Sequence, residues 1–97
     1  MATTHQVSID NMAFNPDSLS VAAGDTVVWT QKMEDMQHTV TADDGSFDSG
    51  ALATNATFSQ TFNTAGSVPY HCEIHPFMTA TVTVTATEGG GEPPKPY

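Results

Sequence analysis

Hydrophobic and polar residues alternate along most of the chain, and no segment shows the period of three to four residues expected of an amphipathic helix. Near the start, Val7 and Ile9 alternate with polar neighbours. Near the other end, Val82, Val84 and Ala86 alternate with threonines. A period of two places successive side chains on opposite faces of a strand, so the pattern predicts strands with one buried face.

The same alternation recurs about every ten residues, which is typical of all-β proteins. The predicted strands cover residues 7–9, 19–21, 26–30, 38–41, 58–62, 68–72 and 79–86. Turn-forming residues separate them, as at Ala23-Gly24-Asp25 and Asp43-Asp44-Gly45. Seven or so short strands at this spacing predict a β-sandwich or barrel. Residues 46–56 carry no pattern that assigns them to an element.

The length of 97 residues allows a single domain. The composition changes after Thr87, because residues 88–97 read EGGGEPPKPY, without apolar periodicity. We therefore expect one folded domain over residues 1–87 and a Gly/Pro-rich tail or linker over residues 88–97. The tail could lead to a membrane anchor or to a second domain. No apolar stretch approaches the roughly 20 residues that cross a bilayer.

The charge is strongly acidic: two Lys+Arg against eleven Asp+Glu give a formal net charge of −9. Lys32 and Lys95 are the only basic side chains besides histidine, which excludes direct nucleic-acid binding through phosphate contacts. The same deficit argues against binding to an anionic membrane surface. Two interpretations remain open, namely a partner with a basic docking face and a solubility adaptation to high salt.

The residues best suited to chemistry lie in one short segment between two predicted strands. Cys72, His75 and Met78 are spaced three residues apart, so a tight loop can turn all three side chains towards one point. The single cysteine excludes an internal disulfide and any site that needs two thiolates. Adding His38 gives two imidazoles, a thiolate and a thioether, the ligand set of a blue-copper electron-transfer centre. Zinc rarely uses methionine and matches less well.

Each of these residues also has an ordinary structural interpretation. A lone buried Cys or Met most often fills the core, and a lone His most often makes a surface hydrogen bond. It is the combination that favours a metal site. Other candidates are interpreted structurally: His5 and His71 as non-ligands, His71 facing outward, Met12, Met33 and Met36 as core or loop packing, and Glu34-Asp35 and Asp43-Asp44 as solvated charge.

Several motifs follow one another in an order that resembles the cupredoxins, the small type 1 blue-copper proteins. They are Phe14-Asn-Pro16, Val21-x-x-Gly24-Asp25-Thr26-Val27-x-Trp29, His38-Thr-Val40, Phe58-x-x-Thr-Phe62 and Tyr70-His-Cys72-x-x-His75-Pro-Phe-Met78. The short ligand loop is most similar to the amicyanin and plastocyanin group. The resemblance implies an all-β, Greek-key β-sandwich of seven to eight strands. It also implies one type 1 copper ion held by His38, Cys72, His75 and Met78.

The resemblance further implies a non-enzymatic electron carrier that cycles between Cu(II) and Cu(I). Electrons would pass through His75, with Pro76 and Phe77 forming an apolar docking patch. Thr39 departs from the family, which commonly has an Asn there that ties the two ligand loops together. We therefore expect the reduction potential or the copper affinity to differ from those of relatives.

The expected partners are redox proteins, such as a dehydrogenase, a cytochrome or an oxidase, and the expected state is a monomer. We expect a periplasmic or other extracytoplasmic location, although no signal peptide is visible in the sequence. Membrane association would require the tail to be a tether. Alternative functions are a periplasmic copper-trafficking protein, the type 1 domain of a larger copper protein, and a metal-free β-sandwich that retains the motif.

Overall fold

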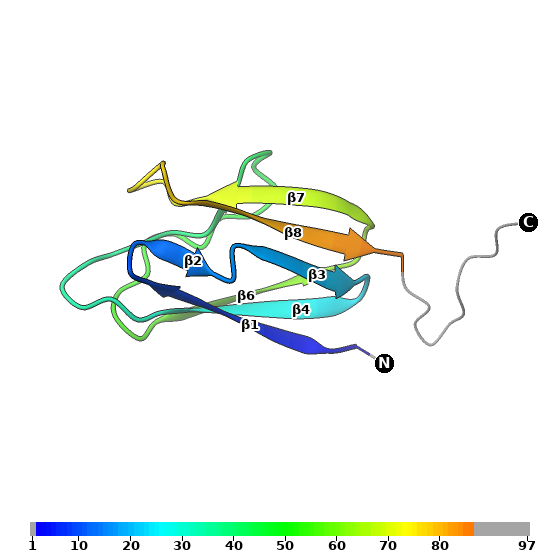
Figure 1. Cartoon of the computed structure of the whole chain (residues 1–97), viewed down its shortest axis with the longest axis horizontal. Coiled ribbons are helices and arrows are strands. Elements are labelled where there is room, and N and C mark those ends of the chain that lie inside the picture. Colours follow the sequence, from blue (N-terminus) through cyan, green and yellow to red (C-terminus); the bar gives the residue numbers. More distant parts are fainter. Residues whose placement is uncertain (1, 87–97) are drawn as a thin grey trace, which may run out of the picture.

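The computed structural model describes residues 2–86, which form two four-stranded sheets packed face to face (Figure 1). The strands are β1 (Thr4–Asp10), β2 (Ala13–Asn15), β3 (Ser18–Ala22), β4 (Asp25–Gln31), β5 (Thr41–Ala42), β6 (Thr57–Phe62), β7 (Gly66–His71) and β8 (Thr79–Thr85). The all-β Greek-key sandwich is confirmed. Within residues 2–86 there is no helix of the length and hydrophobicity that a bilayer span requires. The predicted tail, residues 88–97, lies outside the described residues.

The chain passes repeatedly from one sheet to the other. One sheet has the order β2-β1-β4-β6 and the other the order β3-β8-β7-β5. Two pairs, β1 with β4 and β3 with β8, are parallel, and the remaining pairs are antiparallel. Strand β4 buries every second residue, because alternate side chains face the opposite sheet; these are Asp25, Val27, Trp29 and Gln31.

An aromatic cluster joins the two sheets at the centre of the core. The indole of Trp29 in β4 is fully buried, lies against Phe58 and Phe62 of β6, and donates a hydrogen bond of 3.1 Å to the Tyr70 hydroxyl in β7. Burial raises the pKa of Tyr70 to about 12, so the hydroxyl stays neutral. This bond fixes β7 against the first sheet two residues before Cys72.

The strand predictions hold with two corrections. A strand not predicted from the sequence, β2, pairs with β1. The predicted strand over residues 38–41 is wrong in its extent, because β5 begins only at Thr41 and His38 instead forms an isolated bridge with Leu52. The unassigned segment 46–56 holds no strand, yet Phe47 and Leu52 from it are buried in the core.

At the end of the sandwich where β1 begins, a buried carboxylate ties three segments together. Asp25 accepts hydrogen bonds from the backbone N–H groups of Thr3 (2.9 Å) and Ala22 (3.0 Å), and its other contact is the His5 Nε2 atom at 2.9 Å. The His5 hydrogen bond, followed by the two backbone bonds, lowers the Asp25 pKa to about 2. Gly24 makes the preceding turn with a φ of 98°, a conformation that favours glycine.

Candidate metal centre

Two segments meet at the opposite end of the sandwich: residues 32–40 after β4, and the ligand loop, residues 72–78, between β7 and β8 (Figure 1). The alternation of β7 continues into this loop. Tyr70 and Cys72 are buried, and His71 between them points outward, as predicted. His71 contacts the carboxylates of Asp43 (2.6 Å) and Glu73 (2.8 Å), which raise its pKa in that order. Its ring therefore belongs to a surface ion cluster rather than to the centre.

Backbone hydrogen bonds close the ligand loop on itself. Cys72 N–H donates to the Met78 carbonyl at 3.1 Å, and Met78 N–H donates to the His75 carbonyl at 2.8 Å. Both Cys72 and Met78 are buried, whereas His75 is half-buried and Phe77 is 70% exposed. The three-residue spacing thus turns Cys72 and Met78 inward and leaves Pro76 and Phe77 outside.

Three of the four predicted ligands bring their donor atoms together. The Sγ atom of Cys72 lies 3.7 Å from His38 Nδ1 and 3.8 Å from His75 Nδ1. One ligand atom from each residue lies within 4.8 Å of the others. The two imidazole rings are tilted by 48° relative to each other, with centroids 4.8 Å apart. Met78 is buried in the same closed loop and is the predicted fourth ligand.

The surroundings favour the metal-binding forms of these side chains. Backbone N–H groups of Thr39 and His75 point at the Cys72 sulfur, each at 3.4 Å, and complement the charge of a thiolate. Burial, and then the neighbouring His75, lower the pKa of His38, so its imidazole is neutral and keeps a lone pair for a metal. A buried cysteine sulfur with two imidazoles fits copper, with methionine as a soft fourth ligand.

Thr39 links the two ligand segments, at the position where the resemblance implies an Asn. Its Oγ1 accepts a 2.7 Å hydrogen bond from the Glu73 N–H, next to Cys72. The same hydroxyl contacts Thr41 Oγ1 at 2.9 Å, and Thr41 in turn donates to Asp48 Oδ1 at 3.1 Å. The link is therefore present despite the substitution, and it ends on a carboxylate. The expected change in potential or affinity stays a prediction.

The sequence interpretation missed one residue of the centre. Met33, taken as packing, has its Sδ atom 3.3 Å from His38 Nε2. Its position in a polar segment of no regular period gave no signal for this contact. Among the other residues interpreted as structural, Glu34, Asp35, Asp43 and Asp44 are exposed, His5 contacts Asp25, and Asp35 and Met36 line a pocket together with His75.

Comparison with known proteins gives one consistent result. The family model described as copper binding proteins, plastocyanin/azurin family, matches residues 1–85. Amicyanin of Paracoccus denitrificans is 37% identical over 83 residues, which cover 80% of this chain and 63% of that protein. The chain therefore spans a little under two thirds of the length of this relative.

Solved structures agree with the sequence relatives. An amicyanin variant in the reduced Cu(I) form superimposes with a TM-score of 0.76 at 32% identity, covering 84% of this chain and 81% of that one. A purple cupredoxin from Nitrosopumilus maritimus gives a TM-score of 0.75 at 26% identity, covering 84% of this chain and 99% of that one. Both likenesses extend over most of the described sandwich.

Proposed function

Because the chain belongs to the plastocyanin/azurin family of copper-binding proteins, we propose that it is a small electron carrier with one type 1 copper ion. The observation that supports this most directly is the meeting of a buried cysteine sulfur with two imidazole nitrogens, all within 4.8 Å of one another. In the proposal, His38, Cys72, His75 and Met78 hold the ion. Copper supplies the Cu(II)/Cu(I) couple, and the protein holds one set of ligands for both states.

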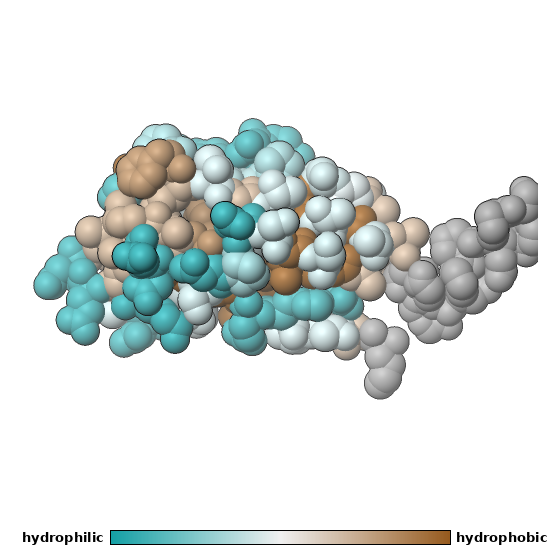
Figure 2. Space-filling model, in the orientation of Figure 1, coloured by the Kyte–Doolittle hydropathy of each residue, from teal (hydrophilic) through white to brown (hydrophobic). Residues whose placement is uncertain are grey.

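The proposed route for electrons is through His75. Of the two imidazoles, His38 is fully buried, whereas His75 reaches the surface. Phe77 lies beside it with a ring centroid distance of 6.1 Å, and Ile74 is 46% exposed. Figure 2 shows hydrophobic surface at the end of the molecule where the ligand loop lies. We assign His75, Pro76 and Phe77 to an apolar docking patch, a surface suited to brief contacts.

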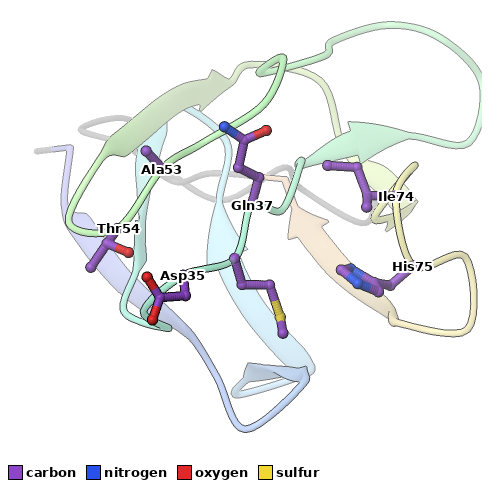
Figure 3. A pocket seen from close by; sticks show the side chains of 7 residues that line it. Asp35, Gln37, Ala53, Thr54, Ile74 and His75 are labelled. Carbon is purple, nitrogen blue, oxygen red and sulfur yellow. The ribbon is translucent and has the colours of Figure 1, made fainter.

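A groove of about 690 Å³ runs beside the same imidazole. Figure 3 shows His75 and Ile74 on one side of it, and Asp35, Gln37, Ala53 and Thr54 on the other. Asp35 places one carboxylate on the border of this groove, and the net charge of −9 makes the chain as a whole acidic. We propose that the redox partner offers a basic face to this end of the molecule. We also propose that the protein is a monomer that works outside the cytoplasm and carries electrons between larger proteins.

The test of copper electron transfer is a titration of the reduced, metal-free protein with Cu(II), followed by visible absorption. An intense band that saturates at one equivalent and vanishes reversibly on one-electron reduction supports the proposal. Cys72→Ser should abolish the band, because the thiolate is its donor. A wild-type protein that stays colourless, or binds copper with unchanged spectra in Cys72→Ser, contradicts it.

Copper trafficking is the alternative that this geometry disfavours. Delivery requires ready release, whereas Cys72 is fully buried and receives two backbone hydrogen bonds. The rate of copper loss to an excess of chelator separates the two functions. Loss over hours supports electron transfer, and complete loss within seconds supports trafficking.

The docking patch has its own test. Phe77→Glu should slow electron exchange with an anionic inorganic oxidant such as ferricyanide by about tenfold, while the copper spectrum stays unchanged. Thr83→Glu adds the same charge on exposed β8, away from the ligand loop, and is the matched control. Equal rates in both variants would contradict the patch assignment.

A further inference from the structure

The second nitrogen of His38 has an unusual neighbour. While Nδ1 faces the Cys72 sulfur, Nε2 lies 3.3 Å from the thioether sulfur of Met33. A thioether has no proton and can only accept a hydrogen bond. The contact is therefore a hydrogen bond only when the imidazole proton is on Nε2. That tautomer leaves the Nδ1 lone pair pointing towards the Cys72 sulfur, where a metal ligand is needed.

The position of the Met33 backbone is built by a buried amide. Gln31, fully buried at the end of β4, accepts a hydrogen bond from the Met33 N–H and donates to the carbonyls of Met33 (3.0 Å) and Met36 (2.8 Å). The Thr54 hydroxyl also donates to the Met33 carbonyl at 2.7 Å. These bonds engage both the N–H and the carbonyl of Met33, so the backbone position from which its side chain extends is fixed.

The sulfur itself is held by a second donor. The Met12 N–H points at Met33 Sδ from 3.3 Å. Met12 and Asn11 form the two-residue turn between β1 and β2, with φ values of 57° and 55°. This left-handed conformation is costly for a side chain such as methionine. Positive φ values at both residues are what a two-residue hairpin loop requires, and this turn brings the Met12 N–H to the sulfur.

We infer that Met33 is a positioning residue for His38. Its sulfur accepts a hydrogen bond from the Nε2–H group and so fixes the tautomer that binds metal through Nδ1. The strength of this hydrogen bond also sets how strongly the imidazole donates electrons to the metal. The inference rests on the proposed copper site. Acceptors behind a ligating imidazole raise its basicity, and their loss typically costs 10–100-fold in metal affinity. A thioether is a weak acceptor. Met33 should therefore leave His38 less electron-rich than an oxygen acceptor would.

Three variants test this with opposite expected signs. Met33→Leu keeps a similar apolar volume without an acceptor, so the affinity for Cu(II) should fall by roughly tenfold and the reduction potential should rise. Met33→Asn places an amide oxygen near the position of the sulfur, so the potential should fall below that of the wild type. Met36→Leu makes the same substitution in the same loop, at a side chain that lines the groove beside His75 but makes no hydrogen bond among the described residues, so the potential should change much less than in Met33→Leu.

The contact is also measured without copper, by NMR of the His38 Nε2 proton in the metal-free protein. Its signal should move upfield in Met33→Leu and downfield in Met33→Asn. The inference would be overturned if Met33→Leu and Met33→Asn changed the reduction potential in the same direction, and likewise the proton shift, or if neither variant changed them. A wild-type protein that binds no copper would overturn the proposed function instead, and the NMR result would still decide the Met33 contact.

Discussion

Both ends of the sandwich carry buried polar groups, but the hydrogen-bond partners of these groups differ between the two ends. At one end, the Asp25 carboxylate is surrounded by donors from Thr3, Ala22 and His5. At the other, the thiol of Cys72 and the Nδ1 atoms of His38 and His75 face one another. The first set is complete within the protein, so it serves stability. The second set concentrates electron-pair donors, which is the arrangement that a cation completes.

Within the ligand end, the two imidazoles also differ in burial and in the number of partners within the protein. His38 is fully buried with partners on both nitrogens, and His75 is half-exposed beside the groove. The difference separates two tasks. The buried ring holds the geometry, and the surface ring gives access to the outside.

Removing each imidazole should have different consequences. Both His38→Gly and His75→Gly should lower copper affinity by more than about 100-fold, because each loses a direct ligand rather than a supporting contact. Added imidazole should restore the blue absorption in His75→Gly, since its site opens to solvent, but not in His38→Gly. Visible titrations with and without imidazole measure this. Equal rescue of both variants would remove the distinction between the two rings.

Copper should stabilise the protein through the ligand end alone. With free copper at 100 times its dissociation constant, the free energy of unfolding should rise by about 2.7 kcal/mol. For a domain of this size the melting temperature should rise by about 10–20 °C. Calorimetry checks both values. Asp25→Asn should keep the full increase and Cys72→Ser should lose it; an increase retained in Cys72→Ser would mean binding elsewhere.

The Thr39 link should contribute a smaller amount. Thr39→Val keeps the shape of a buried side chain but leaves the Glu73 N–H without its acceptor, at a cost of about 1–2 kcal/mol in the metal-free protein. Thr39→Ser keeps the hydroxyl and should recover most of this. Urea unfolding of the two variants measures the difference. Identical midpoints for the valine and serine variants would show that the hydroxyl has no role in joining the loops.

The smallest effect is expected at the Asp25 end and only in acid. The pKa of Asp25 is lowered from 3.8 to about 2 in the folded state, so its contribution is present above pH 3.8 and is lost as the pH falls towards 2. The metal-free protein should lose stability over this window. In Asp25→Asn the same window should be flatter. Chemical unfolding at a series of pH values measures this, and parallel curves would contradict the assignment.

The sequence predicted the site better than its supports. Spacing predicted that Cys72, His75 and Met78 turn inward from one loop, and alternation through β7 then predicted that His71 faces outward. His38 followed because the ligand set required another imidazole. The structure brings His38, Cys72 and His75 together, because their prediction depended on local spacing and on ligand chemistry. That the four residues hold copper stays a prediction.

The residues that support the ligands, such as Met33 and Thr39, depend on contacts between distant segments whose sequences show no hydrophobic periodicity. The position of Met33 is set by the buried Gln31 amide and the Thr54 hydroxyl, and nothing in the polar run 32–37 indicates either partner. Likewise, the hydrogen-bonded link from Thr39 through Thr41 to Asp48 reaches into the segment 46–56, which has no strand pattern. Side-chain networks of this kind are specified only by the assembled fold.

The position of β8 also determines when the centre can form. This strand lies between β3 and β7 in its sheet and pairs in parallel with β3, some sixty residues earlier in the chain. Such pairing gives a high contact order, which slows folding. The sheet that positions Cys72 and Met78 cannot assemble on a growing chain until residue 85 has emerged. The ligands therefore meet late, and copper insertion is expected to follow the completion of folding rather than guide its early steps.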